Sequence, residues 1–477
     1  MSDFIAHEEQ DYTKKFDPQL FLKLARRMRR HWKAMGAVAL FMTFLASTDV
    51  VMPLLTRHAI DSFIGAEPAP GALLRFALLY GAIILGQVAS VFLFIQKAGQ
   101  VEFGVAYDMR QGVFRRLQEL SFSYYDRTSV GYLMSRVASD TNHLAEAFGW
   151  GLLDLVWAFI FLVTSTVTML VIDWQMALYV LAVVPALALI TAFFQKRILR
   201  AQREVRKANS LITGSVNEGI MGAKTTKTLV SEDANFQAFS ELTGRMRAAS
   251  IRAAVLSGIF LPLVIAVSSL ASAYVVSEGA GRVLRGALTL GTLTAFVSYS
   301  VQFFNPIRDI AATFSEMQRI QAAAERVLSL LETEPEIKDT PEVAAKYGDN
   351  FHPKKENWED IRGEIEFARV GFKYRDGDEV LRDFSLHVRP GETIAIVGPT
   401  GAGKSTIVNL LCRFYEPTAG RILIDGRDYR ERSQLWLQSN LGYVLQEPHL
   451  FSGTVLDNIR YARPEATREQ AEAAACL

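Results

Sequence analysis

The stretch Ile394–Leu411, IAIVGPTGAGKSTIVNLL, places a glycine-rich loop between an apolar, strand-like run and a run of helical character. Gly398–Ser405 fits the pattern G-x-x-x-x-G-K-[ST], in which glycines let backbone N–H groups turn toward phosphate oxygens at the start of a helix. Lys404 would add a positive charge, and Ser405 would offer a hydroxyl to Mg²⁺, which prefers oxygen ligands. The stretch therefore predicts a P-loop for a nucleotide with Mg²⁺. The alternative is a glycine-rich turn that holds no ligand.

An α/β pattern surrounds this loop from residue 362 to residue 477. The segment before it, 331–361, is charged, contains proline and has no apolar period, so we predict a linker there. A helix is expected from Lys404 to about Cys412, with the thiol of Cys412 packed in the core. The predicted strands are 364–370, 380–388, 393–397, 421–425 and 441–445.

Upstream of the linker, the sequence contains six apolar segments, each near the ~20 residues that cross the hydrocarbon core of a membrane. A single helix over 149–195 would be roughly 70 Å long, over twice that thickness, so we predict a hairpin at Asp173–Trp174. The expected fold is an α-helical six-span transmembrane domain, 34–330, followed by a partial α/β P-loop nucleotide-binding domain. The predicted spans are 34–56, 72–96, 149–171, 175–195, 253–277 and 287–305.

Basic residues predict the orientation of the spans. The run Lys23–Lys33 has no acidic residue, so 1–33 is expected to be a cytoplasmic segment with a basic elbow helix. The inner segments 97–148 and 196–252 show helical periodicity with interleaved charges, and we predict that they extend the membrane helices into the cytoplasm. Each extension must turn, and the candidate tips are Ser123–Gly131 and Gly219–Thr228.

Composition excludes several classes of protein. The net charge is +1, which gives no global field for nucleic acid. Two cysteines, Cys412 and Cys476, do not make a disulfide framework. The polar N-terminus has no apolar run after a basic start, so no cleaved signal peptide is expected.

Taken together, these motifs resemble the ATP-binding cassette (ABC) exporter family, and especially its bacterial multidrug- or lipid-type half-transporters. The resemblance runs from about Leu20 onward and includes Glu416–Gly426, EPTAGRILIDG. It implies that Tyr374 stacks on adenine and that Gln446 is the Q-loop glutamine, which contacts Mg²⁺ or the attacking water. It also implies ATP and Mg²⁺ as cofactors, a second half-transporter as a partner in a homodimer or heterodimer, and a place in the cytoplasmic membrane with the nucleotide-binding domain inside the cell.

The resemblance assigns roles to individual residues. The catalytic candidates are Lys404 and Gln446, and the Mg²⁺ candidates are Ser405 and Gln446. The nucleotide-binding candidates are Tyr374, Gly398, Pro399, Thr400, Gly401, Ala402, Gly403, Lys404, Ser405 and Thr406. The family's second acidic strand end, its catalytic Glu, its signature motif and its switch His would follow Leu477, so a C-terminally truncated chain that hydrolyses ATP poorly is expected.

The substrate candidates come from the spans. Asp49 is an intramembrane carboxylate, which marks a functional position by default, while Asp154 sits near a span's start, where an interfacial place fits equally well. Phe296, Tyr299 and Phe303 share one helical face of the least apolar span and either contact an apolar substrate or pack against neighbouring helices. The predicted function is ATP-driven export of hydrophobic or amphipathic compounds; the alternative is a regulatory or structural membrane subunit that binds ATP without pumping.

Overall fold

The computed structural model describes residues 17–64, 70–375, 377–446 and 448–476. It divides into two compact units, each described here by itself. The helical unit comprises residues 17–118 and 130–333, and the sheet unit comprises residues 119–129 and 334–476. Residues 1–16 of the predicted N-terminal segment lie outside the described residues.

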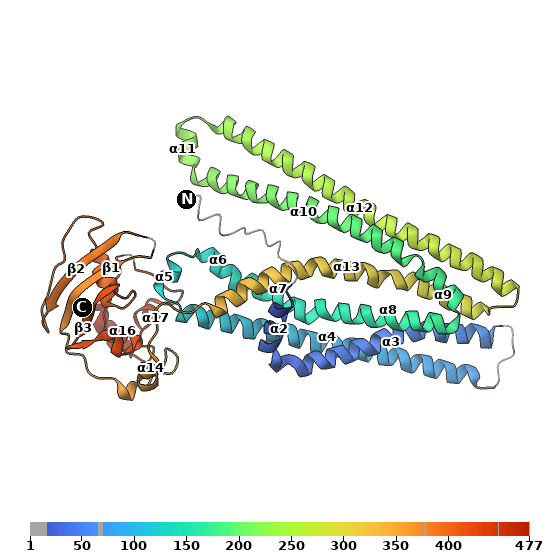
Figure 1. The fold of residues 1–477 in the computed structure, drawn as a ribbon, viewed down its shortest axis with the longest axis horizontal. Coiled ribbons are helices and arrows are strands. Elements are labelled where there is room, and N and C mark those ends of the chain that lie inside the picture. The colour runs from blue at the N-terminus through green and yellow to red at the C-terminus, as the bar shows by residue number, and fades with distance from the viewer. Residues whose placement is uncertain (1–16, 65–69, 376, 447, 477) are drawn as a thin grey trace. The chain divides into compact units, whose positions relative to one another are not determined.

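The helical unit consists of α-helices joined by short turns, with one 3₁₀-helix, η1, and two π-helical segments, η2 and η3 (Figure 1). Its elements are α2 (Pro18–Arg27), η1 (Arg29–His31), α3 (Trp32–Phe63), α4 (Ala72–Glu119), α6 (Val130–Ser135), η2 (Arg136–Asp140), α7 (Thr141–Glu146), η3 (Ala147–Gly151), α8 (Leu152–Ile172), α9 (Trp174–Leu181), α10 (Val184–Met221), α11 (Ala223–Thr228), α12 (Glu232–Leu284) and α13 (Leu290–Glu332).

Five stretches of the described residues are helical, long and apolar enough to cross a membrane. They are Arg29–Phe63, Ala72–Glu119, Val130–Ile172, Trp174–Met221 and Glu232–Leu284. Helix α13, which overlaps the sixth predicted span, is not among them, and its first turns carry Thr292, Ser298 and Gln302. A helical membrane domain is therefore confirmed, while the count of six spans stays a prediction.

The predicted hairpin between the third and fourth spans is confirmed. Helix α8 ends at Ile172 and α9 begins at Trp174, with Asp173 in an extended conformation between them. The Asp173 carboxylate accepts hydrogen bonds from the backbone N–H groups of Gln175 and Met176, at 3.0 and 2.9 Å. Such a cap satisfies donors at the start of a helix that the helix itself cannot pair.

The core of the helical unit is formed by apolar side chains from α3, α8, α9, α10, α12 and α13, including Phe161, Met176, Val275 and Phe296. Because lipid chains are as apolar as these residues, the bundle is held by close packing and interhelical hydrogen bonds. Gly291 shows how close the packing is, since a Cβ there would lie 2.4 Å from the Arg57 carbonyl oxygen. Its N–H donates instead to Asp61 at 2.9 Å.

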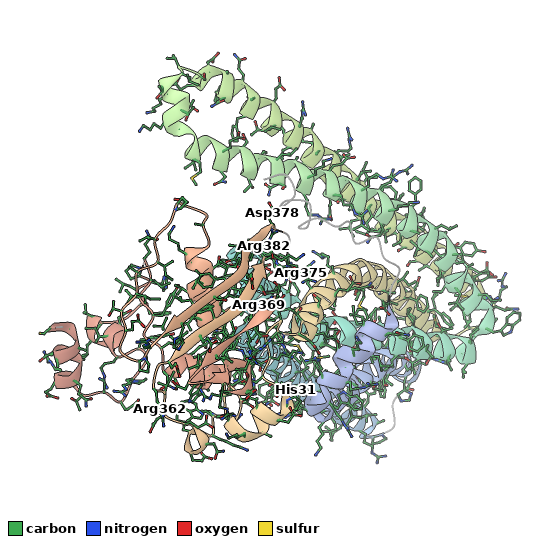
Figure 2. The ribbon with its side chains drawn as sticks, turned by 60° about the vertical axis from the view of Figure 1, so that its left-hand side comes forward. His31, Arg362, Arg369, Arg375, Asp378 and Arg382 are labelled. Atoms are coloured by element: carbon green, nitrogen blue, oxygen red, sulfur yellow. The ribbon has the colours of Figure 1, made fainter. Side chains whose placement is uncertain are left out.

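Helices α10 and α12 form a long antiparallel pair joined by α11 (Figure 1). The turn lies inside the predicted tip Gly219–Thr228. His31, labelled in Figure 2, lies at the junction of α2 and α3, and its ring is hydrogen-bonded to Asp108 of α4 at 2.8 Å.

The sheet unit contains a four-stranded antiparallel sheet in the order β2-β1-β3-β4 (Figure 1). Phe367, Val370, Leu410, Ile422 and Trp436 form its core. The elements are α5 (Phe122–Tyr125), α14 (Pro341–Tyr347), η4 (Lys355–Asn357), β1 (Ile365–Lys373), β2 (Glu379–Val388), α15 (Lys404–Leu411), β3 (Ala419–Ile424), β4 (Arg427–Asp428), η5 (Tyr429–Glu431), α16 (Gln434–Ser439), α17 (Val455–Ile459) and α18 (Arg468–Cys476).

Three of the five predicted strands are confirmed as β1, β2 and β3. The predictions of strands at 393–397 and 441–445 are wrong, because both segments are irregular in the structure. A strand forms only where a neighbouring strand pairs its backbone groups, and no described residue does so here. Val397 and Val444 are accordingly 87% and 95% exposed.

The segment predicted as a linker, 331–361, carries folded structure of its own. It contains α14 and η4, and two of its carboxylates hold it to the rest of the sheet unit. Asp339 accepts a hydrogen bond from the buried Arg413 at 2.8 Å. Glu359 forms an ion pair with Arg427 at 3.5 Å, and inside the segment it accepts hydrogen bonds from Lys346 and from Tyr347, both at 2.9 Å. Residues 331–361 are thus folded and packed onto the sheet unit.

Candidate nucleotide-binding site

The P-loop owes its shape to two glycines in the left-handed region. Gly401 has φ of 86° and Gly403 has φ of 88°, a conformation that side chains other than glycine rarely adopt. Gly403 also packs closely, since a Cβ there would lie 3.1 Å from Val380 Cγ1 and 3.2 Å from Leu381 Cδ2. Helix α15 begins directly after it, so the backbone N–H groups of the loop and first turn lie where an anion is stabilised.

Lys404 folds back over the loop. Its Nζ donates to the carbonyl oxygens of Gly398 and Pro399, at 2.9 and 2.8 Å. The ammonium group therefore lies across Gly398–Lys404, beside the exposed hydroxyl-bearing residue Ser405. This arrangement fits a phosphate group, because amide donors, a cation and a free hydroxyl gather on one short loop.

Tyr374 lies just past the end of β1, next to the P-loop helix. Its hydroxyl shares a hydrogen bond with Thr406 of α15 at 3.2 Å. Its half-buried ring meets Phe372 and Tyr415 edge to face, with centroids 4.8 and 5.1 Å away. Tyr374 is therefore fixed close to the loop, as an aromatic platform for a base requires.

Charged side chains follow the hairpin that carries Tyr374. Figure 2 shows Arg369, Arg375 and Arg382 along the β1–β2 pair. Two of them are engaged with carboxylates, since Arg369 pairs with Asp383 at 3.0 Å and Arg382 with Glu379 at 2.8 Å. Exposed pairs of this kind contribute little to stability, about 0–1 kcal/mol each.

Gln446 is not brought to the P-loop in this conformation. It lies exposed in the irregular segment that follows Leu441, and no hydrogen bond within the described residues joins it to Gly398–Ser405. The segment that contains Gln446 instead packs beside the chain that follows α15, where the ring of Tyr443 lies against that of Phe414 with centroids 5.8 Å apart.

Sequence reasoning missed three residues that come directly after Cys412, namely Arg413, Phe414 and Tyr415. Arg413 is buried and paired with Asp339 and Glu416. The ring of Phe414 lies 4.3 Å from that of Phe122 in α5, and the hydroxyl of Tyr415 donates to Asp126 just after α5. Burial, together with this hydrogen bond, raises the pKa of Tyr415. The signal in the sequence was the dense run CRFYEP directly after the P-loop helix.

Cys412 confirms the expected packing role. It caps the C-terminal end of α15 with only 5% of its surface exposed. Burial raises the pKa of its thiol, which makes the reactive thiolate less available.

Asp49 lies in a polar cluster inside the helical unit. Its two carboxylate oxygens accept hydrogen bonds from Gln87 of α4 at 3.0 Å and from Trp157 of α8 at 3.3 Å. The Gln87 amide also donates to Thr48 at 3.1 Å. All these donors are neutral, and no Lys or Arg forms an ion pair with Asp49 within the described residues. Asp154 lies one turn before Trp157 and is exposed.

The aromatic face predicted on the sixth span is buried. Phe296, Tyr299 and Phe303 are at most 3% exposed and belong to the core of the helical unit. The Tyr299 hydroxyl donates to the carbonyl oxygen of Val50 at 2.5 Å. Pro53 follows in α3, where it deprives the Asp49 carbonyl of its usual helical donor. The three rings thus pack between helices in this conformation.

Comparison with known proteins gives matches along both units. The family model described as the ABC transporter transmembrane region matches residues 35–307, and the model described as ABC transporter matches residues 381–476. An uncharacterized ABC transporter ATP-binding protein of Bacillus subtilis, YfiC, is 31% identical over 94% of this chain and 73% of its own length.

Two further relatives have more specific names. A fatty acid ABC transporter ATP-binding/permease protein of Mycobacterium tuberculosis is 37% identical over 76% of this chain and 55% of its own length. A putative multidrug export ATP-binding/permease protein of Bacillus subtilis, YgaD, is 29% identical over 89% of this chain and 72% of its own length. The chain therefore belongs to the ABC transporter family, as a multi-pass membrane protein that joins the membrane region and the ATP-binding region of an ATP-hydrolysing exporter in one polypeptide.

Proposed function

We propose that the chain is one half of a dimeric exporter that uses ATP to move hydrophobic or amphipathic compounds out across the cytoplasmic membrane. One observation carries the proposal. Residues 119–129 connect two helices of the helical unit in sequence, yet they fold into the sheet unit, where Phe122 contacts Phe414 and Asp126 contacts Tyr415. A movement at the P-loop helix is thereby passed to the chain on both sides of α5.

The residues around the P-loop support a defined division of roles. The amides of Gly398–Gly403 and the ammonium of Lys404 would hold the phosphates of ATP, and Tyr374 would stack on the base. Mg²⁺ would bind at Ser405, with Gln446 as a second ligand once its loop moves toward the site, and would supply positive charge that offsets the phosphate charge. Thr406 would hold Tyr374 in place through the hydrogen bond already present.

Exposed apolar groups on α10–α12 support a second subunit. Ile220, Met221, Leu229 and Val230 at the turn between these helices are 68–84% exposed. Apolar side chains this far from the predicted spans need a protein surface to cover them. We infer that a second half-transporter, identical or homologous, covers this tip with its own ATP-binding region.

The substrate would bind within the helical unit. Asp49 is the strongest candidate, because an intramembrane carboxylate with neutral partners favours a positively charged or hydrogen-bonding ligand. Phe296, Tyr299 and Phe303 would contact the substrate only after α3 and α13 separate, since all three are buried here. The relatives named for fatty acids and for multidrug export are consistent with an apolar or amphipathic cargo.

The basic run Lys23–Lys33 supports an orientation with the N-terminus and the ATP-binding region in the cytoplasm. The chain would lie in the cytoplasmic membrane. Labelling of cysteines placed at exposed positions of α11 and α18 in intact cells tests this orientation, and labelling from outside the cell would refute it.

One experiment tests the proposed function as a whole. The complete transporter is reconstituted into lipid vesicles, and ATP hydrolysis is measured with and without amphipathic compounds, together with their accumulation in the vesicle lumen. We expect hydrolysis that vanadate inhibits and that substrates stimulate, and loss of both hydrolysis and transport in Lys404→Ala. Hydrolysis without transport of any compound across a broad panel would contradict the proposal.

A further inference from the structure

The chain passes between the helical unit and the sheet unit at three places. These are 118–119 at the end of α4, 129–130 before α6, and 333–334 after α13. Inside the helical unit, arginine contacts join the three connections to one another. Arg116 near the end of α4 donates from Nε to the carbonyl oxygen of Leu331 in α13 at 3.2 Å. Arg326 of α13 binds Asp140 of η2, which follows α6.

Asp140 is the centre of this arrangement. It is 3% exposed and accepts two parallel hydrogen bonds from Arg326, at 3.0 Å to Nε and 2.6 Å to Nη2. A bidentate pair of this kind fixes both distance and orientation between two elements. Arg136, also buried, donates to the same carboxylate and lies 3.8 Å from the centre of the Tyr132 ring.

Two arginines share the carboxylate of Asp140. One carboxylate faces two guanidinium groups, and the Nε of Arg136 is buried without a hydrogen-bond partner in the described part of the chain. Removing Asp140 would leave the buried Arg136 and the partly exposed Arg326 close together without the carboxylate that they share, which is less favourable than losing an exposed ion pair. Asp140 is therefore the group that joins the two arginines.

The backbone around Asp140 is unusual as well. Arg136–Asp140 and Ala147–Gly151 are π-helical and flank the short helix α7. Wide turns of this type are rare in helices and occur often at functional sites. Each residue of an α-helix turns about 100°, so the extra residue of a π turn decides which side chains face α13. Here the π turn presents Arg136 and Asp140 together.

We propose that Asp140 is a positioning residue for transport, because it ties α13 to η2 and α7 so that the chain connections to the sheet unit move together. The inference rests on the proposed ATP-driven function, since it says how movement of the ATP-binding region reaches the membrane helices. Asp140 touches neither nucleotide nor substrate. Its role is to hold α13 and η2 in a fixed arrangement, so that the connections at 129–130 and 333–334 move as one body.

The test uses Asp140→Asn in the complete transporter in lipid vesicles. We expect ATP affinity and basal hydrolysis to stay within about twofold of the unmodified protein, while transport per ATP hydrolysed falls about tenfold, within the range of known site-to-site couplings. Arg326→Lys keeps the charge but loses the bidentate geometry, so its loss should be intermediate. Asp140→Glu should restore part of the coupling.

A second readout does not require transport. Spin labels are attached at H143C on α7 and S329C on α13, both exposed positions, in a background with C476S. The distance distribution should be narrow in the unmodified protein and broad in Asp140→Asn. The matched control is Glu204→Gln. It removes an exposed ion pair between α10 and α12, in which Glu204 and Arg252 lie 3.3 Å apart. This variant should change neither transport nor the label distances.

Unchanged transport per ATP in Asp140→Asn, or an unchanged distance distribution, would overturn the inference. Loss of ATP binding together with transport would overturn it too, because it would show a purely structural role. If the unmodified transporter moves no compound, the proposed function fails, and the label distances still decide whether Asp140 ties α13 to α7.

Discussion

The rings of Phe122 and Phe414 lie 4.3 Å apart and 33° from parallel. One ring belongs to α5, which continues into two helices of the membrane region, and the other directly follows the P-loop helix. Phe122 is half exposed, so this contact is a local attachment and not part of a large core. It joins the segment after the P-loop helix to the chain that continues into α4 and α6.

Phe414→Ala is expected to weaken that attachment without disturbing ATP binding. Aromatic pairs contribute roughly 0.5–1.5 kcal/mol beyond the area they bury, so transport per ATP should fall by about three- to tenfold. The measurement is substrate uptake and ATP hydrolysis in the same vesicles. Phe451→Ala is the matched control, because Phe451 stacks on Tyr461 at 4.1 Å in the same unit, and not on a ring of α5. Equal losses in both variants would contradict the prediction.

Gly401→Ala and Gly403→Ala separate backbone strain from crowding in the P-loop. Both glycines have positive φ, which costs a residue with a Cβ about 1–2 kcal/mol. A Cβ at Gly401 meets nothing within 4 Å, whereas one at Gly403 would crowd Val380 and Leu381. We expect the thermal unfolding midpoint and ATP affinity to fall further for Gly403→Ala. A larger effect at Gly401 would show that the loop geometry is different.

Tyr374 is predicted to act through its ring and not through its hydroxyl. Tyr374→Ala should weaken ATP binding about tenfold, since stacking of a base on an aromatic ring contributes roughly 1–3 kcal/mol. Tyr374→Phe keeps the ring and loses only the hydrogen bond to Thr406, so its affinity should stay within about threefold. Fluorescent nucleotide titration measures both. Equal affinities for the Ala variant and the unmodified protein would remove Tyr374 from the site.

The stability of the sheet unit should depend on acid pH through Glu359. Burial alone would raise the pKa of this carboxyl, but hydrogen bonds from Lys346 and Tyr347 lower it below the ordinary value of 4.5. A lowered pKa in the folded state means that the stabilisation is present above pH 4.5 and is lost as pH falls through the folded pKa. Below the pKa values of both the folded and the unfolded state, Glu359 contributes no such stabilisation.

Glu359→Gln should therefore lower the unfolding midpoint at neutral pH and reduce its drop on acidification. Thermal unfolding followed across that pH range measures the effect. Glu356→Gln, three residues earlier and exposed, is the control and should leave the pH dependence unaltered. An unchanged acid dependence in Glu359→Gln would show that other carboxylates dominate.

Asp49→Asn should alter which compounds are transported. The amide still forms hydrogen bonds but carries no charge, so transport of positively charged compounds should fall more than transport of neutral ones. The control is Asp154→Asn, because Asp154 is exposed and outside the polar cluster. Competition between a cationic and a neutral compound in vesicles provides the measurement, and an equal effect on both would argue against a charge-based role.

The sequence was sufficient to predict structural features that depend on residues close together in the chain. The P-loop glycines, the turn at Asp173 and three of the strands follow from local patterns that the structure keeps. The strands at 393–397 and 441–445 could not be predicted correctly from their apolar residues, because a strand depends on a partner that local sequence does not contain. Val397 and Val444, which lie in these two segments, have no strand to pack against and remain exposed.

Contacts between distant residues were beyond sequence reasoning. Periodicity placed Phe296, Tyr299 and Phe303 on one face, but only the packing of α13 against α3 shows that this face is buried. Arg136 and Asp140 are four residues apart, as in an ordinary helical ion pair, but the second guanidinium comes from Arg326, 186 residues away in the chain.

The bond from Tyr299 to Val50 gives the membrane bundle a restoring force. When α3 and α13 part, the Tyr299 hydroxyl loses its acceptor in apolar surroundings, which costs about 1–3 kcal/mol. An empty bundle is thus pulled shut. A cargo that offers an acceptor to the Tyr299 hydroxyl would relieve that pull, so such molecules would dwell longer in the opened state than pure hydrocarbons of the same size.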